Sequence, residues 1–238
     1  MKKLYLMLLT ITLTNCAELQ QVVNNLPSQS GGIGLSNVDI ANGLRQALDK
    51  GIEKQVSKLT KVDGFYKNQL VKILLPEELK KVDNTLRKVG LNKLADQGLK
   101  ILNRAAEDAV KEATPIFVNA VKQMSFNDAK QILLGSDNSA TNYLKNTTKT
   151  ALYGKFNPVI KNSFGKVGAD KIWNTIINKY NSIPLTSKVN PDLTDYVTQE
   201  ALKGVYTMIA VEEKQIRNNF NSRTTDLLKK VFALQDGR

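Results

Sequence analysis

The sequence predicts an all-α fold, a single multi-helix domain of about eight to ten helices with no significant sheet. Apolar residues recur every three or four positions from Ser36 almost to the C-terminus, which is the spacing of one face of a helix. Capping residues, prolines and glycines divide this stretch as helix ends would. No run of alternating apolar and polar residues is long enough to predict a sheet.

The first two predicted helices have clear start signals. Ser36, with Asp39 three positions later, resembles a capping box, and an apolar stripe follows to about residue 62. Pro76 suits the first position of a second helix, because proline lacks the N–H that a helix start leaves unbonded. Gly90 is predicted to end that helix.

A third helix is predicted from Asn92, with charge pairs four residues apart on its exposed face. These pairs are Arg104 with Asp108 and Glu107 with Lys111. Thr114-Pro115 is predicted to break or kink the helix, because the proline ring disfavours helical backbone before it. A further helix is expected over residues 116–124.

The middle of the chain contains a second capping box, Ser125 with Asp128, and Gly135 is predicted to end the short helix that follows. Residues 136–148 are expected to continue as a helix. Asn157-Pro158, a capping residue followed by proline, predicts a new helix start, and that helix should end around residues 165–168.

Three more helices complete the predicted domain. One carries an apolar stripe from Ile172 to Tyr180 and ends at Ile183-Pro184. The longest helix of the chain is expected over about residues 194–220. Leu227 to Phe232 supply the apolar face of the last one.

The N-terminus has the pattern of a bacterial lipoprotein leader. Two lysines and a short apolar run predict a signal peptide over residues 1–15. Leu13-Thr14-Asn15-Cys16 resembles a lipobox, although Asn15 stands where Gly, Ala or Ser is preferred. We therefore expect a lipid on Cys16. The alternatives are a secreted protein whose Cys16 carries no lipid, and a first helix of the fold.

A lipid on Cys16 would hold the protein at the membrane of the cell envelope. Ala17, and not Asp, follows the cysteine, which by resemblance to known sorting rules favours the outer membrane, facing the periplasm. Residues 16–35 are predicted to form a flexible lipidated tether, and residues 36–238 the helical domain. No apolar run beyond residue 15 is long enough to predict a membrane span.

The composition excludes several functions. The chain has no histidine and one cysteine, which excludes Ser-His and Cys-His catalysis, imidazole-ligated zinc and an intramolecular disulfide. No Walker motif, calcium loop or metal-ligand spacing occurs, so no cofactor and no metal are expected.

The net charge of +12 becomes +10 when residues 1–15, with two lysines and no acid, are removed. This favours anionic lipid or an acidic partner. The lysines are spread along every helix and not clustered with aromatic residues, so no nucleic acid is expected.

Several separated motifs resemble those of one bacterial family. They include Leu74-Leu75-Pro76-x-x-Leu79, Leu102-Asn103-Arg104-Ala105-Ala106-Glu107, Phe126-x-Asp128-Ala129 and Arg223-Thr224-Thr225-Asp226-Leu227-Leu228-Lys229. From about Leu35 to Phe232 the chain resembles DUF4197, a family defined by a domain of unknown function. The resemblance implies an exported helical protein, often a lipoprotein, and carries over no catalytic or binding residues.

Glu212 is the candidate catalytic residue. On the helix expected over residues 194–220 it falls on the apolar stripe, between Met208 and Ile216. A carboxylate on a buried stripe needs a cationic or hydrogen-bonding partner or has its pKa raised, and a raised pKa suits acid/base catalysis. The alternatives are an ion pair with an arginine such as Arg104 or Arg223, and a stripe that ends early and leaves Glu212 in water.

Arg223, Thr224 and Thr225 form a second candidate site, for an anion or a partner. They precede the last helix, where free backbone amides together with an arginine can hold negative charge. The alternative is a plain helix cap with a solvated Arg223.

The leading functional hypothesis is a non-enzymatic binding or assembly module of the envelope, which holds an apolar small molecule, a lipid or an envelope protein. The alternative is a carboxylate-dependent hydrolase or lyase on an envelope polysaccharide, since two carboxylates suffice for glycan cleavage. That alternative requires Glu212 to face an open cleft with a second acid within reach. A purely structural spacer is the third possibility.

Overall fold

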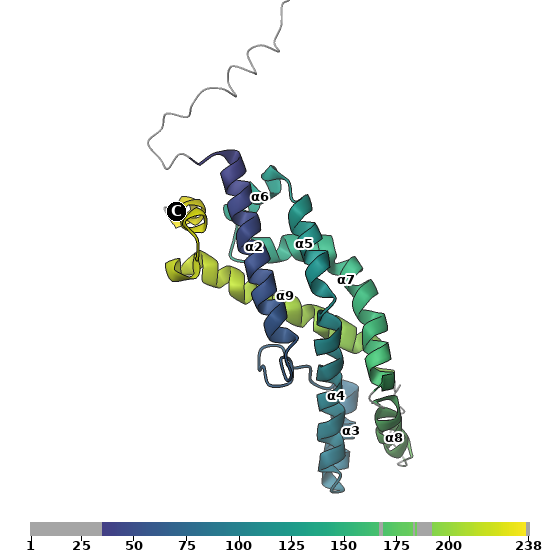
Figure 1. The fold of residues 1–238 in the computed structure, drawn as a ribbon. Coiled ribbons are helices and arrows are strands. Elements are labelled where there is room, and N and C mark those ends of the chain that lie inside the picture. Colours follow the sequence, from purple (N-terminus) through teal and green to yellow (C-terminus); the bar gives the residue numbers. More distant parts are fainter. Residues whose placement is uncertain (1–34, 167–168, 183, 185–191, 237–238) are drawn as a thin grey trace, which may run out of the picture. The chain divides into compact units, whose positions relative to one another are not determined.

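The computed structural model describes residues 35–166, 169–182, 184 and 192–236. Within these ranges it contains nine α-helices, one short 3-10 helix and no strand, so the all-α prediction and the expected number of helices are confirmed. Figure 1 shows the helices, which are α2 (Asn37–Leu59), α3 (Glu77–Lys88), α4 (Asn92–Val110), α5 (Ala113–Gln123), α6 (Phe126–Leu133), α7 (Ser139–Lys166), α8 (Ala169–Asn181), α9 (Thr194–Asn218), η1 (Phe220–Ser222) and α10 (Asp226–Asp236).

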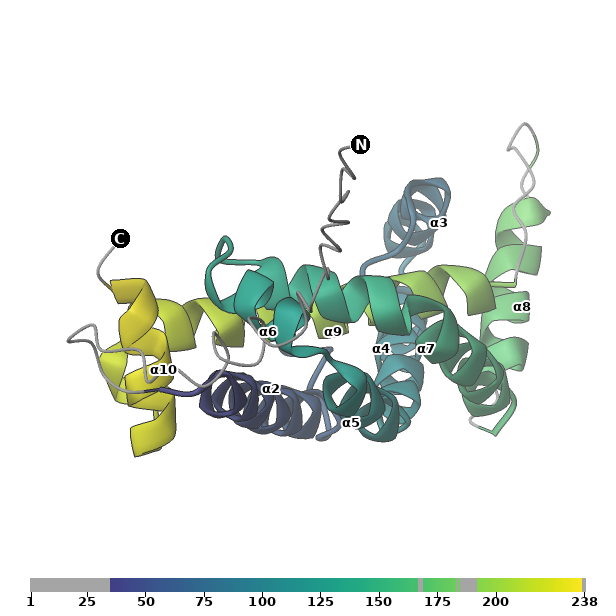
Figure 2. The ribbon, with the colours of Figure 1, turned by 90° about the horizontal axis from the view of Figure 1, so that it is seen from above.

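Helix α9 packs against α7, α2 and α4. Gly204 lets the core approach its backbone closely, since a Cβ at this position would stand 2.6 Å from Cε1 of the fully buried Phe65. Helices α2 and α5 lie side by side in both views (Figures 1 and 2). No helix among the described residues has both the length and the apolar character that a membrane crossing requires.

Both predicted capping boxes are present. Ser36 Oγ accepts a hydrogen bond from the Asp39 N–H at 3.1 Å, and the Asp39 carboxylate accepts one from the Ser36 N–H at 3.0 Å. Ser125 and Asp128 repeat this arrangement at the start of α6. The hydrogen bonds from the serines hold the pKa of both Asp39 and Asp128 below its usual value. These local signals set the two helix starts as the sequence indicates.

The ends of α3 also follow the sequence. Pro76 directly precedes the helix, which begins at Glu77, and Gly90 follows its end with a φ of +79°, a conformation that favours glycine. Helices α4 and α5 are separate, as Thr114-Pro115 predicts, although the break falls a few residues earlier, between Val110 and Ala113.

The prediction of a new helix start at Asn157-Pro158 is wrong. Helix α7 continues through Pro158 without a break and is 28 residues long in total. The longest helix described is therefore α7, and not α9, which has 25 residues. An interior proline costs about 3 kcal/mol. However, Leu152, Phe156 and Ile160 flank Pro158 on one stripe and are all fully buried, each contributing roughly 1.5–3 kcal/mol. Burial of one continuous face therefore outweighs the missing hydrogen bond.

The charge pairs predicted on α4 do not form. They were Arg104 with Asp108 and Glu107 with Lys111. Instead, Arg104 binds Glu107 at 3.1 Å and Asp63 at 2.7 Å, and Lys111 binds Asp108 at 2.7 Å. The carboxylate of Glu107 is buried and accepts hydrogen bonds from the backbone N–H groups of Asp63 and Phe65. Glu107 faces the segment before α3, and not solvent, because that segment folds over it.

Segment 70–75, which connects α2 to α3 without forming a helix, is held beside α9 by side chains from two helices. Asn103 of α4 is fully buried and bonds both backbone groups of Ile73, accepting from its N–H at 2.8 Å and donating to its carbonyl at 2.9 Å. Tyr196 of α9 donates its hydroxyl hydrogen to the carbonyl of Leu74 at 2.7 Å. A segment without regular structure thereby has its backbone groups satisfied and its position set.

Candidate functional site

Glu212 lies on the buried face of α9, as predicted, and is 7% exposed. Its carboxylate accepts hydrogen bonds from Lys54 Nζ at 2.6 Å and from Gln55 Nε2 at 2.5 Å, both on α2. Gly51 makes room for this contact, because a Cβ there would meet Glu212 Cγ at 3.2 Å. The alternative of an ion pair for Glu212 therefore holds, but its cation is Lys54 and not Arg104 or Arg223. The partners are a half-exposed lysine and a buried amide.

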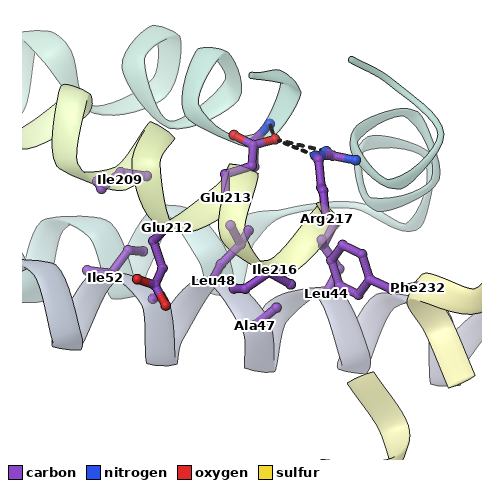
Figure 3. Close-up of a pocket in the computed structure, with 12 residues that line it drawn as sticks. Leu44, Ala47, Leu48, Ile52, Ile209, Glu212, Glu213, Ile216, Arg217 and Phe232 are labelled. Carbon is purple, nitrogen blue, oxygen red and sulfur yellow. Dashed lines mark hydrogen bonds and ion pairs between the residues drawn. The ribbon is translucent and has the colours of Figure 1, made fainter. Parts of the chain in front are cut away.

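Glu213 points away from Glu212, toward Arg217 (Figure 3). Its carboxylate accepts from Arg217 Nη2 at 2.8 Å and from the backbone N–H groups of Ala140 and Thr141 at 2.9 and 2.8 Å. Both side chains of this ion pair are nearly inaccessible, with 5% and 2% exposed. In the sequence, the four-residue spacing of its members is the sole signal for this pair.

Arg217 also donates to the carbonyls of Ile132 and Leu133, which end α6, at 2.7 and 3.1 Å. A negative side chain thus meets the N-terminal amides of α7, and a positive one meets the C-terminal carbonyls of α6, as the dipoles of the two helices favour. The Glu213–Arg217 pair therefore joins α6, α7 and α9.

The cavity around Glu212 and Glu213 is small (Figure 3). It measures about 20 Å³ and is lined mainly by apolar side chains of α2 and α9. A space of that size holds about one water molecule. Glu212 consequently faces no open cleft, and both oxygens of the neighbouring Glu213 are already bonded. The geometry gives no support to a two-carboxylate active site here, and glycan cleavage by Glu212 stays a prediction.

Arg223 is buried, with its guanidinium bonded to the C-terminal end of α9. It donates to the carbonyls of Ile216 and Arg217 at 3.1 and 2.9 Å and forms an ion pair with Asp236. The arginine thus holds α9 and α10 together and is not solvated.

The two threonines beside Arg223 have other contacts. Thr225 Oγ1 donates to Gln46 Oε1 at 2.8 Å and accepts from the Leu228 N–H at 3.2 Å, which caps α10. Thr224 contacts Lys50 at 3.5 Å. An anion or partner site at Arg223, Thr224 and Thr225 stays a prediction. Cys16 and the leader lie outside the described residues.

A groove between α7 and α9 has a volume of about 480 Å³, within the range of small-molecule sites. The two helices run antiparallel along it, because Thr141 meets Glu213, Thr148 meets Tyr206 and Tyr153 meets Asp195. These contacts hold the two helices together, and the neighbouring side chains of α7 and α9 form the two walls of the groove.

Three lysines line this groove, Lys145 and Lys149 from α7 and Lys203 from α9, and the lining contains one acid, Glu200. Lys145 and Lys149 are exposed, and neither has an ion-pair partner in the described part of the chain. Lys203 contacts Glu200 at 3.5 Å, with 71% of the lysine side chain exposed. The groove therefore carries an excess of positive charge that the protein itself does not neutralise.

The rest of the groove is lined by neutral hydrogen-bonding side chains, notably Asn138, Asn142 and Gln199, and by the apolar Leu202 and Ala210. At its base the buried Tyr206 hydroxyl lies 2.8 Å from Thr148 Oγ1. The Thr148 hydroxyl already donates to the carbonyl of Leu144, so Tyr206 is the donor in this contact. Burial raises the pKa of Tyr206, which keeps its hydroxyl protonated at neutral pH.

The sequence did not point to this groove. Lys145 and Lys149 are four residues apart and thus share one helix face, where two like charges are unfavourable. That spacing was the available signal in the sequence. It indicates a binding groove only together with Lys203, which lies more than fifty residues later and comes close to Lys145 and Lys149 because α7 packs on α9. Among the described residues, no group of three or more His, Cys, Asp or Glu is placed to hold a metal ion.

A family model described as "Protein of unknown function (DUF4197)" matches residues 34–233 of the 238-residue chain. The chain belongs to the DUF4197 family. The match covers all the described helices except the end of α10, and so confirms the resemblance carried by the sequence motifs. No curated protein and no solved structure gives a significant match to this DUF4197 protein.

Several motifs of the DUF4197 protein have structural roles. Asn103 and Glu107 fasten the segment that precedes α3, Ser125 and Asp128 start α6, and Arg223 joins α9 to α10. The lysines of the groove lie outside the motifs on which the resemblance was based.

Proposed function

We propose that this protein is a non-enzymatic binding module of the cell envelope, held at the membrane by a lipid on Cys16, and that it binds an anionic ligand in the groove between α7 and α9. The observation that carries the proposal is the group Lys145, Lys149 and Lys203 around a groove of about 480 Å³. Its electrostatic field would concentrate negative charge at this surface.

The chemistry of the groove favours an anion over the apolar ligand expected from the sequence. The apolar cavity beside Glu212 has room for about one water molecule. The large apolar side chains that are exposed in the described ranges are Val38, Val62, Leu70, Leu74, Val89, Phe220 and Leu234. None of them lines the cavity beside Glu212 or the groove between α7 and α9. Lysines and side-chain amides, by contrast, converge on one groove.

The proposal is tested by titration calorimetry on the full-length protein, purified with its lipid in non-ionic detergent. Oligogalacturonate and tripolyphosphate serve as anionic probes, and maltohexaose as the neutral probe. We expect both anions to bind more tightly than maltohexaose, and more weakly as the salt concentration rises, because exposed charges are screened. Native mass spectrometry of the protein taken from its own envelope should reveal a bound anionic compound.

The decisive variant combines Lys145→Gln, Lys149→Gln and Lys203→Gln. If each exposed contact contributes about 0.5–1 kcal/mol, the three together should weaken anion binding roughly 10- to 100-fold. The matched control removes three exposed lysines outside the groove, Lys93, Lys155 and Lys171, also as glutamine. Equal losses in the two triple variants, or equal binding of neutral and anionic probes, would show that the groove is not the site.

A further inference from the structure

A second groove lies between α9 and segment 70–75. It has a volume of about 290 Å³. Three α9 side chains, those of Glu200, Lys203 and Thr207, line both this groove and the first one. Their spacing of three and four residues puts them on one exposed face of the helix. The two grooves are therefore adjacent across a single ridge.

Positive charge continues across this ridge. The first groove contributes Lys145 and Lys149, the ridge contributes Lys203, and the second groove contributes Lys72. Lys72 Nζ lies 4.5 Å from the centre of the Tyr66 ring, a cation–π contact that leaves the ammonium without a carboxylate partner among the described residues. Glu200 is the single acid in the lining of either groove.

We propose that the two grooves together bind one extended chain, an anionic oligosaccharide with carboxylate or phosphate groups along its length. The proposal rests on the proposed function and names its ligand class. Axes of packed helices lie about 8–10 Å apart, so lysines on α7, on α9 and in the segment beyond α9 spread positive charge across both grooves. A chain with repeated charges meets each lysine in turn.

The lining favours a glycan over other anionic polymers. The side-chain amides of Asn138, Asn142 and Gln199 can both donate to and accept from sugar hydroxyls. Leu70 and Leu74 at the edge of the second groove are 65% and 54% exposed, and they offer apolar surface to the C–H faces of sugar rings.

Peptides and nucleic acids fit less well. The described part of the chain has no strand edge to which a peptide could add a strand. Single-stranded nucleic acid needs exposed aromatic rings for base stacking. Tyr206 in the first groove is only 7% exposed, and Tyr196 in the second groove is partly buried, with its hydroxyl bonded to the carbonyl of Leu74.

The experiment compares galacturonate oligomers of increasing length, a trimer and an octamer, on the full-length protein in detergent. The octamer should bind roughly 10-fold or more tightly than the trimer, because occupying the second groove becomes intramolecular once the first is filled. The variant Lys72→Gln should weaken octamer binding roughly three- to fivefold and leave trimer binding unchanged. The variant Lys149→Gln should weaken both. Lys61→Gln, an exposed lysine upstream of the same segment, is the control and should weaken neither.

Each outcome has one meaning. Equal affinity of trimer and octamer, with no effect of Lys72→Gln, would overturn the two-groove proposal and leave anion binding at α7 and α9 intact. Tighter binding of a linear polyphosphate than of the galacturonate octamer would overturn the assignment to a glycan. Binding of none of these anions would overturn both this proposal and the proposed function.

Discussion

Replacing Glu213 by glutamine removes the negative charge of the ion pair that joins α6, α7 and α9. The side chain stays about the same size, but Arg217, with 2% of its side chain exposed, keeps its positive charge. Glutamine also has one oxygen in place of two, while the Glu213 carboxylate now accepts bonds from the amides of Ala140 and Thr141 as well as from the guanidinium. Breaking a buried pair on one side costs about 3–5 kcal/mol.

We expect Glu213→Gln to lower the free energy of unfolding by that amount, measured by urea denaturation followed by circular dichroism. For a domain of this size the melting temperature should fall by roughly 6–20 °C. The control is the same substitution at Glu200, on the same helix, whose contact with Lys203 is 3.5 Å long and largely exposed. That control should change stability by less than about 1 kcal/mol.

A double-mutant cycle with Arg217→Met completes the test. Removing both charges should recover only part of the loss, because the carbonyls of Ile132 and Leu133 and the amides of Ala140 and Thr141 then lack their partners. If Glu213→Gln unfolded at the same urea concentration as the Glu200→Gln control, the pair would not hold the three helices together and the reasoning would be wrong.

Three further predictions concern stability. Gly204→Ala should destabilise the fold by about 1–3 kcal/mol, because its methyl group would stand 2.6 Å from the Phe65 ring. Gly154→Ala, with open space around it, should stabilise the fold by about 0.5–1 kcal/mol. Urea denaturation should therefore give changes in stability of opposite sign for the two variants. Pro158→Ala should raise the melting temperature, since an alanine restores an interior helix hydrogen bond. Burial raises the pKa of Asp49, so ionisation of this carboxyl group destabilises the folded state. The variant Asp49→Asn should therefore be more stable than the wild type at pH values above about 4 and equally stable below about pH 3. Urea denaturation of both proteins over this pH range is the measurement.

Helix starts could be predicted because their signals are local. A serine and an aspartate three residues apart satisfy each other's backbone groups, whatever the rest of the chain does, as Ser36 and Asp39 show. Pro158 shows the limit of local signals. A proline that would end an isolated helix lies inside α7, because the residues on both sides bury one face against the same core.

The candidate site depends on contacts that local patterns do not contain. The burial of Glu212 could be predicted from its place between Met208 and Ile216, but its partners, Lys54 and Gln55, come from a helix more than 150 residues earlier. The same applies to Glu107, whose spacing from Lys111 predicted a surface pair and whose true partners belong to a distant segment. The lysines of the groove meet only once α7 and α9 have packed.

The late position of α9 in the chain has a consequence for synthesis of the protein. The helix against which α2, α4 and α7 bury their apolar faces is the second-last α-helix to leave the ribosome. A nascent chain that has not reached Thr194 has no surface on which to complete its core, and it exposes those faces to water or to chaperones. Completion of the fold must therefore wait for nearly the whole chain, and a premature stop before α9 removes the helix on which α2, α4 and α7 all pack.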